Sequence, residues 1–270
     1  MFMQAKEKML SIDWLKLLDG QCYVGPEYIP GRNWLSPQDL IALMDQHHVA
    51  DAIVIHTCSM LTGNSTPQIG NGRLLDEVAG MDRLHPGWVL NPIGEISDEE
   101  KRVQDMLDKG VRVAMLYPKQ MPILPWLFRN LLTVLEAHRV PVIVEFAAGS
   151  AFAYGTLDKQ DWRTIYEIAK TYPRLPLIIG GMVGTGSWDA VLPLLRECKN
   201  VHFDAMHCCA LWPDYIKKIG PQQFVWASRA PKYDPGMYVS CIQYIEGIND
   251  DARKLIAGDN LRLLMGQTFL

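Results

Sequence analysis

Short apolar runs alternate with amphipathic segments along almost the whole chain. Runs rich in Val, Ile and Leu predict buried strands at 17–24, 52–55, 87–92, 111–117, 141–146, 175–180, 201–204 and from 224 onward. The segments between them carry apolar residues at helical spacing and predict helices at 38–48, 70–83, 97–110, 126–138, 162–172, 187–198 and 213–219. Strand and helix therefore alternate from the first run to the last.

Local signals support these boundaries. Ser36, Pro37 and Asp39 form a helix start, and Gly110 is placed to end the helix that Ser97-Asp98-Glu99-Glu100 caps. Repeated strand–helix units imply a parallel sheet with right-handed crossovers, and eight such units imply a closed (β/α)8 barrel. No low-complexity linker interrupts them. The sequence predicts one α/β domain over 1–270, with barrel elements from about 16 to 265 and closing helices at 249–265.

Composition narrows the class of protein. The chain has 270 residues, 49% hydrophobic and 21% charged, and its formal net charge is −4. This balance, without a Lys/Arg run, gives no reason to expect a nucleic-acid partner. No apolar run reaches the ~18 residues of a membrane span, and the charged start lacks an apolar signal core, so we expect a cytoplasmic protein. No Cys-x-x-Cys pair suggests a structural zinc site.

Three stretches carry a resemblance to a known family. Asp19-Gly20-Gln21-Cys22-Tyr23 stands where that family has Asp-x-His-x-His, and Ala227-Ser228-Arg229-Ala230-Pro231 stands where it has Gly-Ser-Asp-x-Pro. The tail 249–264 resembles its closing helices. The chain is thus similar to the amidohydrolase-related (amidohydrolase-2) family of metal-dependent hydrolases and decarboxylases. The resemblance implies a TIM barrel with its site at the carboxyl ends of the strands.

The positions that match the family's metal ligands have changed. The two first-strand histidines fall on Gln21 and Tyr23, the fifth-strand histidine on Glu145, the sixth-strand histidine on Gly181, and the eighth-strand aspartate on Arg229. Arg donates hydrogen bonds but accepts none and keeps its proton, so it cannot ligate a metal. A mononuclear zinc site needs about three protein ligands. We therefore expect neither the family metal nor another cofactor.

Several polar residues are expected to face one another at the strand ends. Since ligands of one metal lie close together, Glu145 and Arg229 should form an ion pair in the place of the metal. The candidate catalytic residues are Glu145, His207, Asp204, Tyr23 and His56. The candidate substrate-binding residues are Arg229, Gln21 and Gly181, with Arg229 receiving an anionic group.

Three functions remain open on this evidence. The first is a metal-independent hydrolase or lyase for a small carboxylated or cyclic substrate, since some members of the resembled family act as lactonases without a metal. The second is an inactive relative that binds a metabolite or accompanies an active paralogue. The third is a metal enzyme that uses Glu145, His56 and His207. The sequence leaves the substrate, the partner and the oligomeric state open, a homo-oligomer included.

Overall fold

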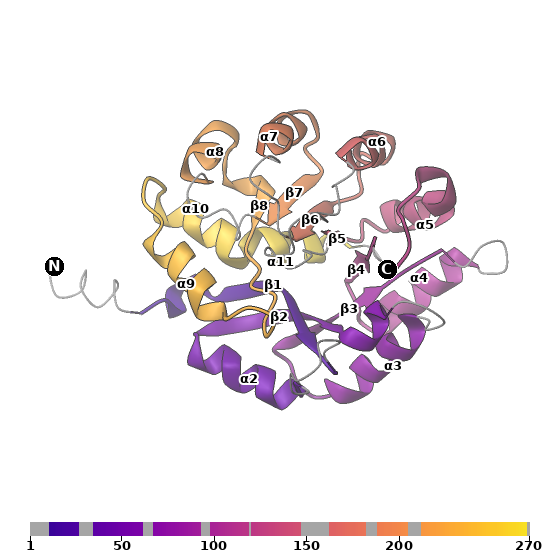
Figure 1. Ribbon diagram of the computed structural model, residues 1–270, viewed down its shortest axis with the longest axis horizontal. Helices are drawn as coiled ribbons and strands as arrows, with labels where there is room; N and C mark the ends of the chain where they lie inside the picture. Colours follow the sequence, from indigo (N-terminus) through magenta and orange to yellow (C-terminus); the bar gives the residue numbers. More distant parts are fainter. Residues whose placement is uncertain are drawn as a thin grey trace, which may run out of the picture.

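The computed structural model describes residues 11–26, 35–61, 67–92, 98–118, 120–146, 162–181, 188–204 and 212–268. In this part of the chain eight parallel strands follow one another in sequence order around a single sheet, as Figure 1 shows. The strands are β1 (Leu17–Val24), β2 (Val49–His56), β3 (Leu84–Val89), β4 (Val113–Leu116), β5 (Val142–Phe146), β6 (Leu177–Gly181), β7 (Val201–Asp204) and β8 (Phe224–Val225). The predicted barrel is confirmed. β3 begins at Leu84, earlier than expected, because Leu84 already pairs with Ala52 of β2.

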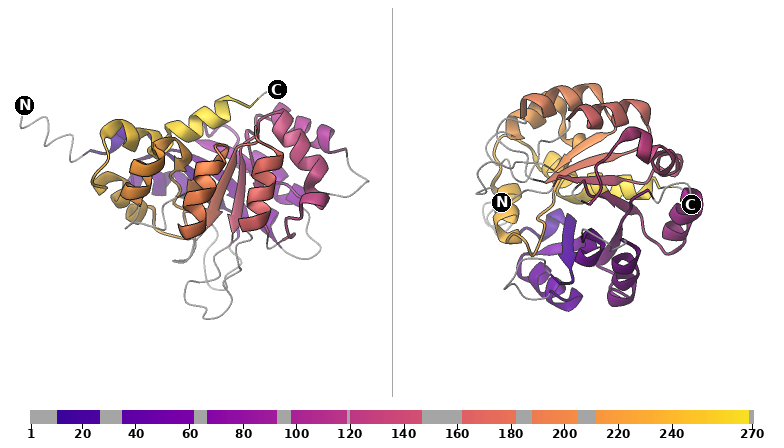
Figure 2. Two further views of the ribbon diagram at one scale, coloured as in Figure 1. Left: turned by 90° about the horizontal axis from the view of Figure 1, so that it is seen from above. Right: turned by 45° about the vertical axis from the view of Figure 1, so that its right-hand side comes forward.

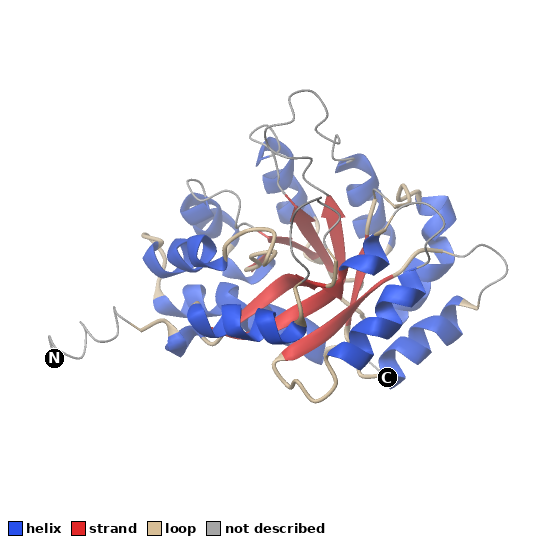
Figure 3. Ribbon diagram, turned by 60° about the horizontal axis from the view of Figure 1, so that its bottom comes forward, coloured by secondary structure: helices blue, strands red, loops and turns tan. Residues whose placement is uncertain are grey.

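Helices surround the strands, as the predicted strand–helix alternation requires (Figure 3). The helices between strands are α2 (Pro37–Gln46), α3 (Pro67–Glu77), α4 (Glu99–Asp108), α5 (Pro125–Ala137), α6 (Trp162–Thr171), α7 (Trp188–Glu197) and α8 (Trp212–Ile219). After β8 come α9 (Pro235–Tyr244), which the sequence did not predict, α10 (Asp250–Lys254) and α11 (Asn260–Gly266). None of the described helices combines the length and hydrophobicity that a bilayer-spanning segment requires.

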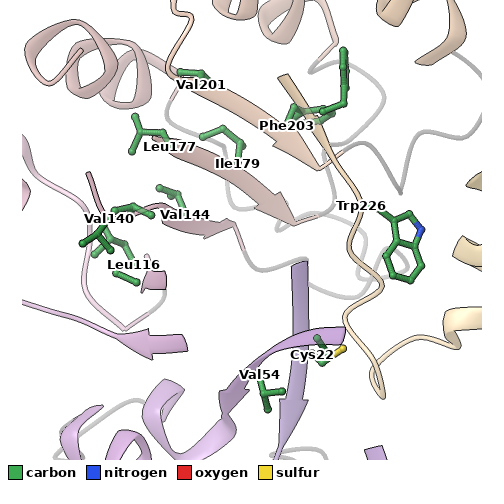
Figure 4. Close-up of a cluster of buried hydrophobic side chains, with 14 of the residues drawn as sticks. Cys22, Val54, Leu116, Val140, Val144, Leu177, Ile179, Val201, Phe203 and Trp226 are labelled. Atoms are coloured by element: carbon green, nitrogen blue, oxygen red, sulfur yellow. The ribbon is translucent and has the colours of Figure 1, made fainter. Parts of the chain in front are cut away.

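Alternation along each strand separates two hydrophobic clusters. Val54, Val144 and Ile179 belong to the larger cluster, which fills the space between strands and helices (Figure 4). Their neighbours Ile53, Ile143 and Ile178 belong to a smaller cluster inside the barrel. Since successive side chains of a strand point to opposite faces, a residue's place in this alternation tells whether it faces the barrel interior.

The amino ends of the strands are closed by α11. Leu261 and Leu264 of this helix pack with Leu18 of β1 in the interior cluster. Figure 2 shows α11 and the C-terminus together at one end of the strands. Functional side chains of a TIM barrel belong at the opposite, carboxyl end.

Backbone bonds between β1 and the segment after β8 complete the barrel. Gly20 N–H donates to the Trp226 carbonyl at 3.0 Å, Arg229 N–H to the Gln21 carbonyl at 2.8 Å, and Tyr23 N–H to the Ala230 carbonyl at 2.7 Å. The segment after β8 therefore lies beside β1 and is joined to it by backbone hydrogen bonds. This pairing places the Arg229 backbone directly against that of Gln21.

A buried carboxylate reinforces the same seam. Asp19 accepts hydrogen bonds from Ser228 N–H at 2.8 Å, from Gln21 N–H at 3.1 Å and from the Ser228 hydroxyl. Burial raises the pKa of Asp19, and the bonds from Ser228 counter part of that rise. The aspartate retained at the start of the Asp-x-His-x-His frame thus has a structural role here.

We expect Asp19→Ala to lower the free energy of unfolding by about 3 kcal/mol, since it leaves several buried donors without an acceptor. Asp108→Ala, at an exposed carboxylate of α4, is the matched control and should change stability by less than about 0.5 kcal/mol. Urea unfolding followed by circular dichroism measures both. Equal stabilities of the two variants would show that the Asp19–Ser228 contact does not hold the seam.

Candidate active site

Three charged side chains meet inside the carboxyl end of the barrel. Nη2 of Arg229 lies 2.5 Å from Oδ2 of Asp204, and Nε of Arg229 lies 3.3 Å from Oε1 of Glu145. The side chains are only 1% exposed for Arg229 and 2% for each carboxylate, so water screens them little. We call Glu145, Asp204 and Arg229 the ion triad. The expected Glu145–Arg229 pair is present, and Asp204 joins it as a second carboxylate.

The two carboxylates hold the guanidinium differently. The Asp204 contact is the closer ion pair, with Nη2 2.5 Å from Oδ2, and it lacks the geometry of a hydrogen bond. The hydrogen bonds from Arg229 to Glu145 are long, from 3.3 to 3.5 Å. Asp204 therefore fixes the guanidinium, whereas the Glu145 carboxylate is more loosely held. Burial alone would lower the pKa of Arg229, but Asp204 and Glu145 outweigh burial and raise it, so the side chain stays charged.

The backbone at Arg229 is strained to bring this side chain inward. Its φ is 60°, in the left-handed region that a long side chain rarely adopts. The Arg229 N–H bond to Gln21 and a bond from Lys232 N–H to the Arg229 carbonyl at 2.9 Å hold the conformation. Strain of this kind persists only where the surrounding structure enforces it, and it is concentrated at functional sites.

A glycine leaves room for the triad on β6. Glu145 pairs in register with Gly180, and a Cβ at Gly180 would come within 2.7 Å of Glu145 Oε2 and 3.1 Å of Arg229 Nη2. Gly180 is therefore the β6 residue beside the triad. The sequence analysis assigned this place to Gly181, which pairs with Phe146 one step further along the strand.

Two uncharged polar side chains of β1 lie beside the triad. The Gln21 amide donates a hydrogen bond to the Tyr23 hydroxyl, and Gln21 Oε1 lies within 3.2 Å of the Gly180 Cβ position. Burial, followed by the charge of Glu145, raises the pKa of Tyr23 well above its ordinary value. The phenol therefore keeps its proton. Because its oxygen accepts from Gln21, its own O–H can donate to a bound molecule.

One donor of the triad meets no acceptor in the described part of the chain. Among the residues that the structure describes, none accepts a hydrogen bond from Nη1 of Arg229, although this atom is fully buried. A buried donor without an acceptor costs free energy. An oxygen atom of a ligand beside Nη1 and the Tyr23 hydroxyl would remove that cost.

These residues do not fit the metal site of the resembled family. The Arg229 guanidinium lies between Glu145 and Asp204, in the place where a cation would have to contact both carboxylates. Gln21, Tyr23 and Gly180 supply no imidazole. Within the described ranges, no group of three or more His, Cys, Asp or Glu side chains is arranged to hold a metal ion.

His56 lies apart from the other candidates. It shares the outward face of β2 with Ala52 and Val54, and its Nε2 is 3.5 Å from Oε2 of Glu77 in α3. Its Nδ1 accepts from Cys58 N–H at 3.1 Å. Burial lowers the pKa of His56, and Glu77 opposes that shift in part. The ring also fits against Gly25, where φ is +93° and a Cβ would come within 2.7 Å of it. These contacts give His56 a structural role.

The remaining candidate, His207, lies outside the described residues. The structure therefore does not test the predicted Asp204–His207 pair or the ligand set of Glu145, His56 and His207. Asp204 contacts Arg229, and His56 faces the helices. The sequence analysis missed Tyr117, which follows β4, packs at the barrel interior and raises the pKa of Tyr23 slightly.

A parallel barrel with a polar site at its carboxyl end defines the class of this protein, and comparisons specify it further. A model of the amidohydrolase family matches residues 68–262, which is most of the chain. The chain therefore belongs to the amidohydrolase family. A comparison with the sequences of curated proteins found no match.

Solved structures share the fold at low sequence identity. The 5-carboxyvanillate decarboxylase of Sphingomonas paucimobilis is 13% identical, with a TM-score of 0.72 over 93% of this chain and 99% of that one. The 2,6-dihydroxybenzoate decarboxylase of Rhizobium is 18% identical, with a TM-score of 0.70 over 93% and 98%. A dihydroxybenzoic acid decarboxylase of a Polaromonas species, solved with bound manganese and 2-nitroresorcinol, is 14% identical, with a TM-score of 0.70 over 93% and 96%.

The triad predicts how stability responds to loss of its cation. Arg229→Met should lower the free energy of unfolding by about 3–5 kcal/mol at pH 8, because two buried carboxylates then face each other without a counter-charge. Without Arg229 the two carboxylates repel each other, and protonation of either one removes that repulsion, so the penalty shrinks as the pH falls. Chemical unfolding at pH 8 and pH 5 measures this difference.

Arg163→Met is the matched control, since Arg163 is 86% exposed and forms an ion pair with Glu167 on the same helix. It should change stability by less than about 1 kcal/mol at either pH. A loss of stability at Arg229→Met that matches this control would mean that the triad is not formed.

A buried histidine in the barrel predicts a second pH effect. His202 lies between the outward-facing Val201 and Phe203, and burial lowers its pKa to about 4 despite a bond with the Gln222 backbone. The unfolded chain, with a His pKa near 6.5, then binds more protons than the folded chain between these values. Stability should fall by about 3 kcal/mol as pH drops from 6.5 to 4 through this residue alone. His202→Gln should remove that component, which unfolding titrations of both proteins would resolve. The same pH slope in both would contradict a neutral buried His202.

Proposed function

We propose that this protein is a metal-independent hydrolase or lyase that acts on a small carboxylated or cyclic substrate. The observation that carries the proposal is the buried Arg229 guanidinium, whose Nη1 meets no acceptor among the described residues. It supplies a positive charge and a hydrogen-bond donor in the region where family members use a metal. The named activities of the structural neighbours, decarboxylation of 5-carboxyvanillate and 2,6-dihydroxybenzoate, agree with a carboxylated substrate.

Binding would use the two donors that the site offers, Nη1 of Arg229 and the Tyr23 hydroxyl. Nη1 of Arg229 and the Tyr23 hydroxyl would donate to one oxygen of the substrate, either a carboxylate oxygen or the carbonyl of a lactone or amide. Donors fixed in advance in a dry site stabilise negative charge as it develops on such an oxygen. Asp204 holds the guanidinium in position for this contact.

Glu145 would transfer the proton in this reaction. Its long bonds to Arg229 leave the carboxylate able to accept a proton from an attacking water and to return it to the leaving group. In a lyase reaction Glu145 would first take up a proton from solvent and then donate it to the carbon from which CO2 departs. His207 is a further candidate for this step from its place after β7 in the sequence.

A second function is favoured by one specific observation. The short Arg229–Asp204 contact and the nearly complete burial of the triad also suit a filled, inactive site. In that case the protein binds a metabolite elsewhere or accompanies an active relative. The two functions differ in whether any small molecule reaches Arg229.

A thermal-shift screen of small carboxylates and lactones separates them. At a ligand concentration of ~100 Kd, binding stabilises the folded protein by about 2.7 kcal/mol and should raise Tm by several degrees. Arg229→Met should abolish the shift, and Arg163→Met should keep it. Glu145→Gln should keep or enlarge the shift and reduce turnover by about 100-fold or more.

Turnover is measured as acid release from a lactone that shifts Tm. If no ligand shifts the wild type, or if the shifts persist in Arg229→Met, the enzymatic proposal fails and the inactive alternative stands. A shift without turnover would identify a binding protein.

A further inference from the structure

The charge of the ion triad restricts what the site can hold. Arg229 contributes one positive charge, and Glu145 and Asp204 contribute one negative charge each, so the triad has a net charge of −1. The other described groups around it are uncharged: Gln21, Tyr23 with its raised pKa, and the phenol of Tyr117. No described side chain besides Arg229 brings a positive charge to this group.

A carboxylate ligand would therefore add a second net negative charge at a buried place. Charges at these separations interact strongly where water is excluded, and like charges raise the pKa of their neighbours. The repulsion disappears if one proton enters with the ligand. A lactone, ester or amide carbonyl meets no such repulsion, because it brings no charge to Arg229.

We propose that this site admits only occupants that add no net charge: a neutral carbonyl compound binds directly, and a carboxylate binds together with one proton. The proposal deepens the function proposed above and rests on it. The proton is taken from solvent and lies between the ligand oxygen and Glu145. Glu145 is the acceptor because Arg229 holds Asp204 at 2.5 Å and Glu145 only at 3.3 to 3.5 Å.

Isothermal titration calorimetry with benzoate and its neutral isostere benzamide tests the proposal. Titrations of the wild type in phosphate and in Tris at pH 7 give the number of protons taken up, since the buffers differ in ionisation enthalpy. Benzoate should bind with uptake of about one proton, and its affinity should fall about tenfold per unit rise in pH. Benzamide should bind without uptake and independently of pH.

Two variants test whether the negative charge of the triad restricts benzoate binding. Asp204→Asn and Glu145→Gln each bring the triad to a net charge of zero, so benzoate should bind them at pH 8 at least about tenfold more tightly than it binds wild type, without proton uptake. Their affinity for benzamide should change much less. Asp108→Asn is the control for a carboxylate far from the site and should behave as wild type.

The possible outcomes distinguish failure of this charge restriction from failure of the proposed function. Binding of benzoate without proton uptake, or with an affinity that does not depend on pH, overturns the charge restriction and leaves the proposed function standing. Failure of both probes to bind wild type at millimolar concentration overturns both. If neither variant folds, the wild-type proton count alone decides.

Discussion

A guanidinium buried between two carboxylates is the constraint on which the site of this protein depends. A charge so far from water persists only with partners, and Arg229 has them on β5 and β7. Its position requires the left-handed backbone at φ 60°, the pairing of the segment after β8 with β1, and the absence of a side chain at Gly180. The Asp19–Ser228 contact holds that seam beside it. The contacts that close the barrel therefore also position the residues of the site.

The barrel keeps the family scaffold and carries an ion triad at its carboxyl end. In a metal enzyme, the cation both polarises the substrate and neutralises its carboxylate ligands. Here Arg229 can take over the neutralising role and donate hydrogen bonds, but it cannot activate a water molecule by coordination. Proton transfer must then come from a side chain, which is the role we assign to the loosely held Glu145. A shared fold does not fix a function, and the argument for this protein rests on the triad itself.

Much of this architecture could be predicted from the sequence, and the exceptions have physical reasons. The alternation of strands and helices and the Glu145–Arg229 contact followed from pattern and from the matched family positions. The side of β2 on which His56 lies could not be predicted, because residues 52–55 are all apolar and show no alternation of apolar and polar positions. Gly180 was missed because a shift of one residue along a strand moves the side-chain position to the other face. The contact of Asp204 with Arg229 could not be predicted, because the two residues are 25 positions apart in the sequence. Helix α9 was not predicted, because it opens with Pro235-Gly236, which is a turn signal.

Metal content tests the central claim most directly, because the account holds that Arg229 occupies the place of the family cation. The protein would be purified without chelators or affinity metals, and zinc, manganese and iron would be measured by elemental analysis alongside Arg229→Met. The account predicts far less than one metal ion per chain in the wild type, and still no tight binding in the variant, since Gln21, Tyr23 and Gly180 remain. One tightly held metal ion per wild-type chain, lost together with activity on chelation, would contradict it.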